Sequence, residues 1–235
     1  MSYPSLMSAL RSALHPVLRS LLAIAVATSA SGALAQAEQQ KLVAAADTTF
    51  NNFMRDPDMT WLQQNIGRAK GVLIAPEVAK AGFIFGGSGG RAVLVARDAK
   101  SGKWVGPAFY TMATASVGFQ AGIAVSEMLT LVMTEKALHS LLSDSVKLGP
   151  DASVAAGPIG AGAKADVVTD LVSYSRSKGL YGGVNLDGTV VAVSKDWNER
   201  FYGRPVSAPD ILVRMSARSK AGDKLISDVS RAGKR

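Results

Sequence analysis

The residues with the clearest chemical potential lie in the segment Ser173-Tyr174-Ser175-Arg176-Ser177-Lys178-Gly179. In an alternating strand, Arg176 and Lys178 would share one face, and Ser175 and Ser177 would share the other. Guanidinium and ammonium groups attract phosphate, and serine hydroxyls donate hydrogen bonds to its oxygens. The segment therefore predicts a binding site for a phosphate headgroup. The alternative is an exposed strand end with solvated charges.

The carboxy-terminal segment 214–235 holds a second group of cations. It contains seven basic and two acidic residues, and the whole chain carries a formal net charge of +8. Lys and Arg near an anionic membrane contribute about 1 kcal/mol each, so this segment predicts attachment to such a surface. The alternative is a solvated terminus that only improves solubility. The predicted lipid-contacting residues here are Arg214, Arg218, Lys220 and Lys224, and Lys70 and Lys80, near glycine turns, complete the set.

The composition offers little for catalysis, metal binding or nucleic acids. The absence of cysteine and the presence of only two histidines, His15 and His139, exclude thiolate catalysis, disulfides and multi-histidine metal sites. The segment 157–164 lacks the glycine-lysine-hydroxyl ending of a phosphate loop, and the cations are not interleaved with aromatic residues as in nucleic-acid binders. We therefore expect a non-enzymatic protein without cofactor or metal. An undetected hydrolase that uses His139 is the enzymatic alternative.

Residues 1–35 have the pattern of an export signal. Arg11 and Arg19 precede the apolar run 21–27, and Ala33-Leu34-Ala35 is typical of a cleavage site. The alternative is an uncleaved anchor, but the stretch 21–37 is shorter than the roughly 20 apolar residues that a span needs. The pattern predicts an exported protein, periplasmic or secreted, that is peripheral on a membrane.

Periodicity predicts the elements that position these groups. Apolar residues at three- and four-residue spacing predict a helix over 36–55, and Pro57 starts a second helix through about Ile66. Glycine-punctuated apolar runs then predict strands, with 86–90 as a turn. The dipeptide Asp187-Gly188 predicts a hairpin. Strands are expected at 71–75, 82–86, 92–97, 103–110, 115–126, 171–175, 180–186 and 189–193, strand and then helix over 127–142, extended chain over 152–166, and helix from Asp210.

The segment 115–126 alternates bulky and small residues, which leaves one face of the expected strand nearly bare. A bare face lets another backbone, a helix or a ligand approach closely. It supports an alternative function, in which a structural protein of the cell envelope self-associates through this face without lipid specificity. Replacing Gly118 or Gly122 by leucine would then disrupt the oligomer.

Several blocks of the sequence, in order, resemble the SYLF domain family of lipid-binding proteins, which includes actin-patch proteins of eukaryotes. The blocks are 69–74 with 80–83, 102–108, 118–122, 147–149, 154–160, 173–181, and Asn198 with 201–203. The resemblance covers about residues 65–212. With it, the chain divides into the signal 1–35, a helical segment 36–66, a SYLF-like domain 67–212 and a basic tail 213–235.

The resemblance implies a single α+β domain, in which a strongly curved antiparallel sheet or barrel-like core is flanked by helices. It also implies binding to phosphoinositides or other anionic phospholipids, and in eukaryotic relatives binding to actin. Of these two kinds of partner, an exported chain would meet the anionic phospholipid membrane. Actin is implied by the family analogy alone.

Overall fold

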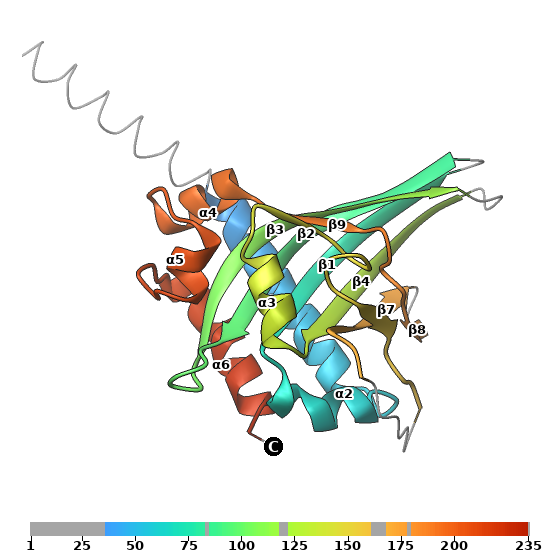
Figure 1. The fold of residues 1–235 in the computed structure, drawn as a ribbon, viewed down its shortest axis with the longest axis horizontal. Coiled ribbons are helices and arrows are strands. Elements are labelled where there is room, and N and C mark those ends of the chain that lie inside the picture. The colour runs from blue at the N-terminus through green and yellow to red at the C-terminus, as the bar shows by residue number, and fades with distance from the viewer. Residues whose placement is uncertain (1–35, 83–84, 118–121, 161–167, 178–179, 235) are drawn as a thin grey trace, which may run out of the picture. The chain divides into compact units, whose positions relative to one another are not determined.

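A strongly curled sheet of nine strands organises the computed structural model, which describes residues 36–82, 85–117, 122–160, 168–177 and 180–234 (Figure 1). The strand order is β5-β9-β3-β2-β1-β4-β7-β6, and β8 pairs with β7. All pairs are antiparallel except β6 with β7. The strands are β1 (Gly71–Gly82), β2 (Phe85–Arg97), β3 (Trp104–Val117), β4 (Gly122–Val132), β5 (Ser145–Lys147), β6 (Val154–Ala156), β7 (Leu171–Ser177), β8 (Leu180–Gly183) and β9 (Val190–Val193).

Helices cover both faces of the sheet. The N-terminal helix, residues 36–55, packs on one face with α2, α4 and α6, and α3 and α5 pack on the other. The helices are α2 (Thr60–Asn65), α3 (Glu135–Leu141), α4 (Lys195–Tyr202), α5 (Ala208–Leu212) and α6 (Asp223–Ala232), with short 3-10 turns at Ile66–Arg68 and Lys220–Gly222. Residues 39–235 form one compact unit; of the other unit, 1–38, only 36–38 are described. Among the described residues, no helix is both long enough and apolar enough to span a bilayer.

The central strands are buried on both faces because their side chains alternate between the two helix layers. In β2, Val93 and Val95 face the layer of the N-terminal helix, whereas Ala92 and Leu94 face α3 and α5. These continuous apolar runs form two cores, one on each side of the sheet. The α+β domain with a strongly curved, helix-flanked sheet is thus confirmed.

The glycine-rich segment 86–90 is part of β2, so the prediction of a turn there was wrong. Gly90 lies opposite Val78 of β1 and Met112 of β3, which places it inside the sheet. A Cβ atom at Gly90 would lie 2.2 Å from the carbonyl oxygen of Glu77, next to the register shift between Ile74 and Glu77. The glycine therefore permits close backbone approach at a bulge.

Two further expectations about strands were also wrong. Gly188 occupies a turn with a φ of 80°, but the strands beside it do not form a hairpin, because β9 inserts between β5 and β3 while β8 pairs with β7. The single strand expected over 115–126 is divided between the end of β3 and the start of β4, which pair with β2 and β1 respectively. Residues 118–121, with Gly118, lie outside the described part of the chain.

The C-terminal region folds as two helices rather than one helix from Asp210. A capping box of Ser207 and Asp210 starts α5, and α6 begins only after Gly222. Leu225 and Val229 of α6 are fully buried against the sheet. The residues 213–221 between the two helices therefore form a largely exposed connection anchored at both ends.

The carboxylate of Asp170 links three segments by hydrogen bonds, which make the stability of the fold depend on pH. Its carboxylate accepts hydrogen bonds from the Thr134 hydroxyl (2.6 Å) and from the Ser153 amide (3.0 Å) and hydroxyl (2.9 Å). These bonds, with that of Thr134 the strongest cause, lower the pKa of Asp170 to about 2. Because the folded-state pKa is depressed, the stabilisation is present above the ordinary pKa of 3.8 and is lost as the pH falls towards 2.

We expect Asp170→Asn to lower the free energy of unfolding by about 2 kcal/mol at pH 7, since it weakens hydrogen bonds to a charged group. The difference between variant and wild type should shrink as the pH falls from 4 to 2. Urea unfolding at several pH values measures both quantities. A difference that stays constant over this range would contradict the assignment.

Candidate functional site

Arg176 forms an ion pair inside the domain. Its guanidinium group contacts the carboxylate of Glu127 on β4 and lies 3.4 Å from the hydroxyl of Tyr181, with its Cζ atom 5.5 Å from the Tyr181 ring centroid. Glu127 also accepts a hydrogen bond of 3.1 Å from Thr49 of the N-terminal helix. The charge of Arg176 is therefore balanced by Glu127. Its side chain links β7 to β4 and β8.

The neighbouring predicted residues lie along the same strand. Ser175 is half-buried opposite Met128 of β4, and the Ser177 hydroxyl donates a hydrogen bond of 3.2 Å to the carbonyl oxygen of Val125. Lys178 lies outside the described residues. The headgroup role predicted for this segment stays a prediction.

Lys70 lies directly before β1 and Lys80 lies near the end of that strand. Lys70 forms an ion pair of 3.3 Å with Glu135 of α3, whereas Lys80 is exposed opposite Ser88 and Ala124. Ten residues of strand separate them by about 33 Å. The structure therefore does not bring these two lysines into one site.

Lys224 fastens α6 to the N-terminal helix. Its ammonium group contacts the carboxylates of Asp47 and Asp228, the latter at 3.0 Å, and Asn51 donates a hydrogen bond of 3.0 Å to Asp228. Lys224 thus already has two anionic partners within the domain.

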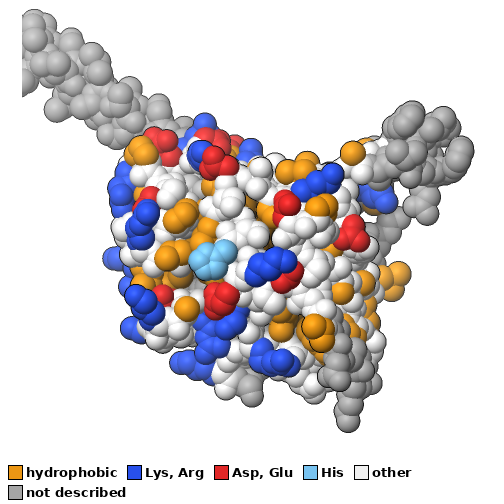
Figure 2. Space-filling model, viewed as in Figure 1, with side chains coloured by type: hydrophobic (Ala, Val, Ile, Leu, Met, Phe, Trp, Pro, Cys, Tyr) orange, Lys and Arg blue, Asp and Glu red, His pale blue; other side chains and the backbone are white. Residues whose placement is uncertain are grey.

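The remaining predicted cations gather in the exposed segment 213–220. Arg214 pairs with Asp210 at 2.7 Å and Arg218 with Asp223 at 3.3 Å, while Lys220 has no ion pair within the described residues. Such exposed pairs contribute only about 0–1 kcal/mol each, so an incoming phosphate can replace the carboxylates at little cost. Figure 2 shows Lys and Arg side chains gathered on the side of the molecule where α5 and α6 lie in Figure 1.

Exposed apolar side chains lie among these cations. Val213 is 51% exposed and Met215 is 48% exposed. The backbone of Met215 has a φ of 52°, in the left-handed region that residues other than glycine rarely adopt. Strained residues of this kind concentrate at functional sites. We call residues 213–220 together with Lys103 the cationic-apolar surface.

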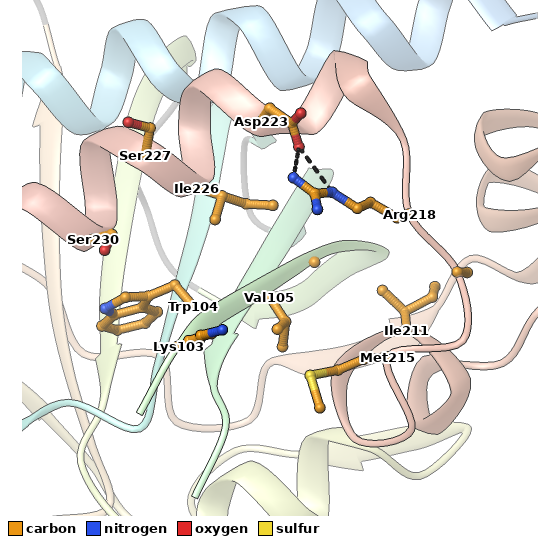
Figure 3. A pocket seen from close by; sticks show the side chains of 12 residues that line it. Lys103, Trp104, Val105, Ile211, Met215, Arg218, Asp223, Ile226, Ser227 and Ser230 are labelled. Carbon is orange, nitrogen blue, oxygen red and sulfur yellow. Dashed lines mark hydrogen bonds and ion pairs between the residues drawn. The ribbon is translucent and has the colours of Figure 1, made fainter. Parts of the chain in front are cut away.

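A groove of about 550 Å³ opens beside this surface, where the start of β3 meets α6 and the segment after α5 (Figure 3). Its apolar lining comes from Trp104 and Val105 of β3, Ile226 of α6, Ile211 of α5 and Met215 of the segment after α5. Polar groups lie at its rim. They are Lys103, Arg218, Asp223, Ser227 and Ser230. This combination of apolar walls and a few charged groups is typical of a site for an amphiphilic ligand.

This groove is not visible in the sequence. Lys103 and Trp104 are separated from Arg218 by more than a hundred residues, and only the packing of α5 and α6 against β3 brings them together. The available signal was the interleaving of Val213 and Met215 with Arg214 at a helix end. Among the described residues, no group of three or more His, Asp or Glu gathers in a manner that could hold a metal ion.

Comparisons with known proteins agree with the resemblance noted in the sequence. The family profile described as "Ysc84: Las17-binding protein actin regulator" matches residues 113–232. The match includes the segment 213–220 and all of α6, so these belong to the part of the chain that the family shares. No solved structure matches significantly.

Curated relatives match about two thirds of the chain. "LAS seventeen-binding protein 3" of Saccharomyces cerevisiae is 38% identical over 152 residues, covering 62% of this chain and 33% of the relative. "Protein YSC84" of the same species is 35% identical over 166 residues (68% and 35%), and "SH3 domain-containing YSC84-like protein 1" of Homo sapiens 33% over 161 residues (66% and 46%). This chain thus spans a third to a half of the length of these relatives, one of which is named for binding.

Proposed function

The chain belongs to the Ysc84 (SYLF) family, and from this premise we propose that it is a peripheral lipid-binding protein that attaches to anionic phospholipid bilayers. Residues 1–35 direct its export, so that it acts in the periplasm or outside the cell. The cationic-apolar surface makes the contact. No catalytic step is part of this function.

The observation that supports the proposal is the pairing of exposed apolar and cationic side chains in 213–220. Arg214, Arg218 and Lys220 can together contribute about 3 kcal/mol at an anionic surface. Val213 and Met215, about half exposed, can bury their remaining apolar area in the interface, at roughly 25 cal/mol per Å². Attachment therefore combines a salt-sensitive and a salt-insensitive contribution.

Headgroups with several phosphates suit this surface best. Arg214 and Arg218 can each hold two phosphate oxygens with their guanidinium forks, and Lys103 and Lys220 add further charge. We accordingly propose a preference for phosphoinositide-like headgroups over headgroups with a single negative charge.

Vesicle co-sedimentation of residues 36–235 tests the proposal. With phosphatidylcholine vesicles that contain phosphatidylserine or a phosphoinositide, the protein should sediment at 50 mM salt and be largely released at 500 mM salt, because salt screens exposed charges. With phosphatidylcholine alone it should stay in the supernatant. Equal recovery from neutral and anionic vesicles at both salt concentrations would reject the proposal.

The family description favours one second candidate, in which the chain binds an actin-regulating protein or actin itself. Under this candidate, the purified protein would co-sediment with filamentous actin in the absence of lipid. Neutralising the 213–220 cations would then leave vesicle recovery unchanged.

A further inference from the structure

The groove next to the cationic-apolar surface has the dimensions and chemistry of a ligand site in its own right. Its volume of about 550 Å³ lies within the usual range for small-molecule pockets. Pockets in this range hold small-molecule ligands, and a single alkyl chain belongs to that size class.

Apolar side chains from several elements line the groove. Trp104 and Val105 come from β3, Ile226 from α6, and Ile211 from α5, so three separate elements line it. Small residues keep it open, with Ala217 on the segment after α5 and Ser227 and Ser230 on α6. An alkyl chain placed here would replace water along these walls, which is favourable at roughly 25 cal/mol per Å² of apolar surface buried.

Cations lie at the mouth of the groove. Lys103 is exposed and has no ion pair within the described residues. Arg218 is 82% exposed, and its only acidic partner within that part of the chain is Asp223 at 3.3 Å (Figure 3). With Asp223 included, the rim carries a net charge of +1, which complements a single anionic head.

We infer that the groove binds one long-chain fatty acid, with the alkyl chain along Trp104, Val105 and Ile226 and the carboxylate between Lys103 and Arg218. This inference deepens the proposed function and rests on it, because Met215 and Arg218 belong to both surface and groove. On a membrane, the protein would therefore take up a single-chain anionic lipid as well as contact the headgroups.

Trp104 provides a built-in reporter for the test. Bromine atoms on an alkyl chain quench tryptophan fluorescence on contact, and the other two tryptophans lie elsewhere, Trp61 in α2 and Trp197 in α4 beneath Arg91. Dibromostearate, added below its micelle concentration, should quench the wild-type protein saturably. Unbrominated stearate should reverse this quenching by competing for the groove. The Trp104→Phe variant should show little quenching.

Two variants that narrow the groove from opposite sides complete the test. Ala217→Phe and Ser230→Leu should each raise the apparent Kd for dibromostearate at least 10-fold, and Lys103→Gln should raise it about 5-fold, while circular dichroism reports folding. The inference is overturned if the wild-type protein is not quenched, or if both groove variants are quenched as strongly as the wild type. If quenching is absent but wild-type vesicle binding remains, the inference alone fails; if vesicle binding is also absent, the proposed function fails with it.

Discussion

Replacing Arg214, Arg218 and Lys220 together by glutamine should weaken binding to anionic vesicles about 100-fold at low salt. Each cation near an anionic bilayer contributes about 1 kcal/mol, and 1.4 kcal/mol corresponds to a factor of ten in affinity. The loss should shrink at high salt, where the wild-type protein also loses this attraction. Vesicle titration at 50 and 300 mM salt measures both effects.

The chain offers a matched control for this triple variant. Lys136 and Lys195 are exposed and paired with Asp170 and Asp144, as Arg214 and Arg218 are with their own aspartates, and Lys147 is exposed like Lys220. Replacing these three lysines by glutamine removes the same net charge from other elements. An equal loss of affinity in both triple variants would show that net charge, and not the 213–220 segment, controls binding.

Gly157→Ala should destabilise the fold by about 3 kcal/mol. A Cβ atom at this position would lie 2.1 Å from Cζ of Tyr174 and within 2.5 Å of two further ring atoms. The Tyr174 ring is fully buried in the core on the side of the N-terminal helix, so it cannot move aside without disturbing its neighbours. Overpacking of this kind typically costs about 1–3 kcal/mol and sometimes more. Urea unfolding monitored by circular dichroism gives the value.

Gly182→Ala is the control for that substitution. Gly182 lies on β8, the neighbour of the strand that carries Tyr174, but no atom lies within 4 Å of a Cβ added there. The free energy of unfolding should therefore change by less than about 1 kcal/mol. Comparable destabilisation by both substitutions would mean that the packing around Gly157 is not what the structure indicates.

Local periodicity predicted two helical stretches correctly, although it gave no signal for α4, and it did not predict the strand pairing. The helix over 36–55 and the strand-to-helix passage over 127–142 follow from apolar spacing within a single segment. Strand partners depend on residues distant in sequence, which no local pattern specifies. For this reason 86–90 looked like a turn although two neighbouring strands pair with it, and Asp187-Gly188 looked like a hairpin although its flanking strands pair elsewhere.

The site shows the same division between local and distant information. The excess of cations after Arg214 is visible in the sequence, and three of the predicted cations lie together on the 213–220 segment. The partner of Arg176 was not predictable, because Glu127 lies on another strand and only the β4–β7 register places the two side by side. The groove depends in the same way on β3, which the charge pattern alone does not connect to α6.

A single label at position 215 tests the central claim most directly. The chain contains no cysteine, so one environment-sensitive fluorophore can be attached to the cysteine introduced by Met215→Cys. Lys136→Cys on α3 provides the control position. With phosphatidylserine vesicles, the emission at position 215 should rise and shift to the blue while that at position 136 stays unchanged. Unchanged emission at position 215, under conditions where the protein sediments with the vesicles, would contradict attachment through the 213–220 segment.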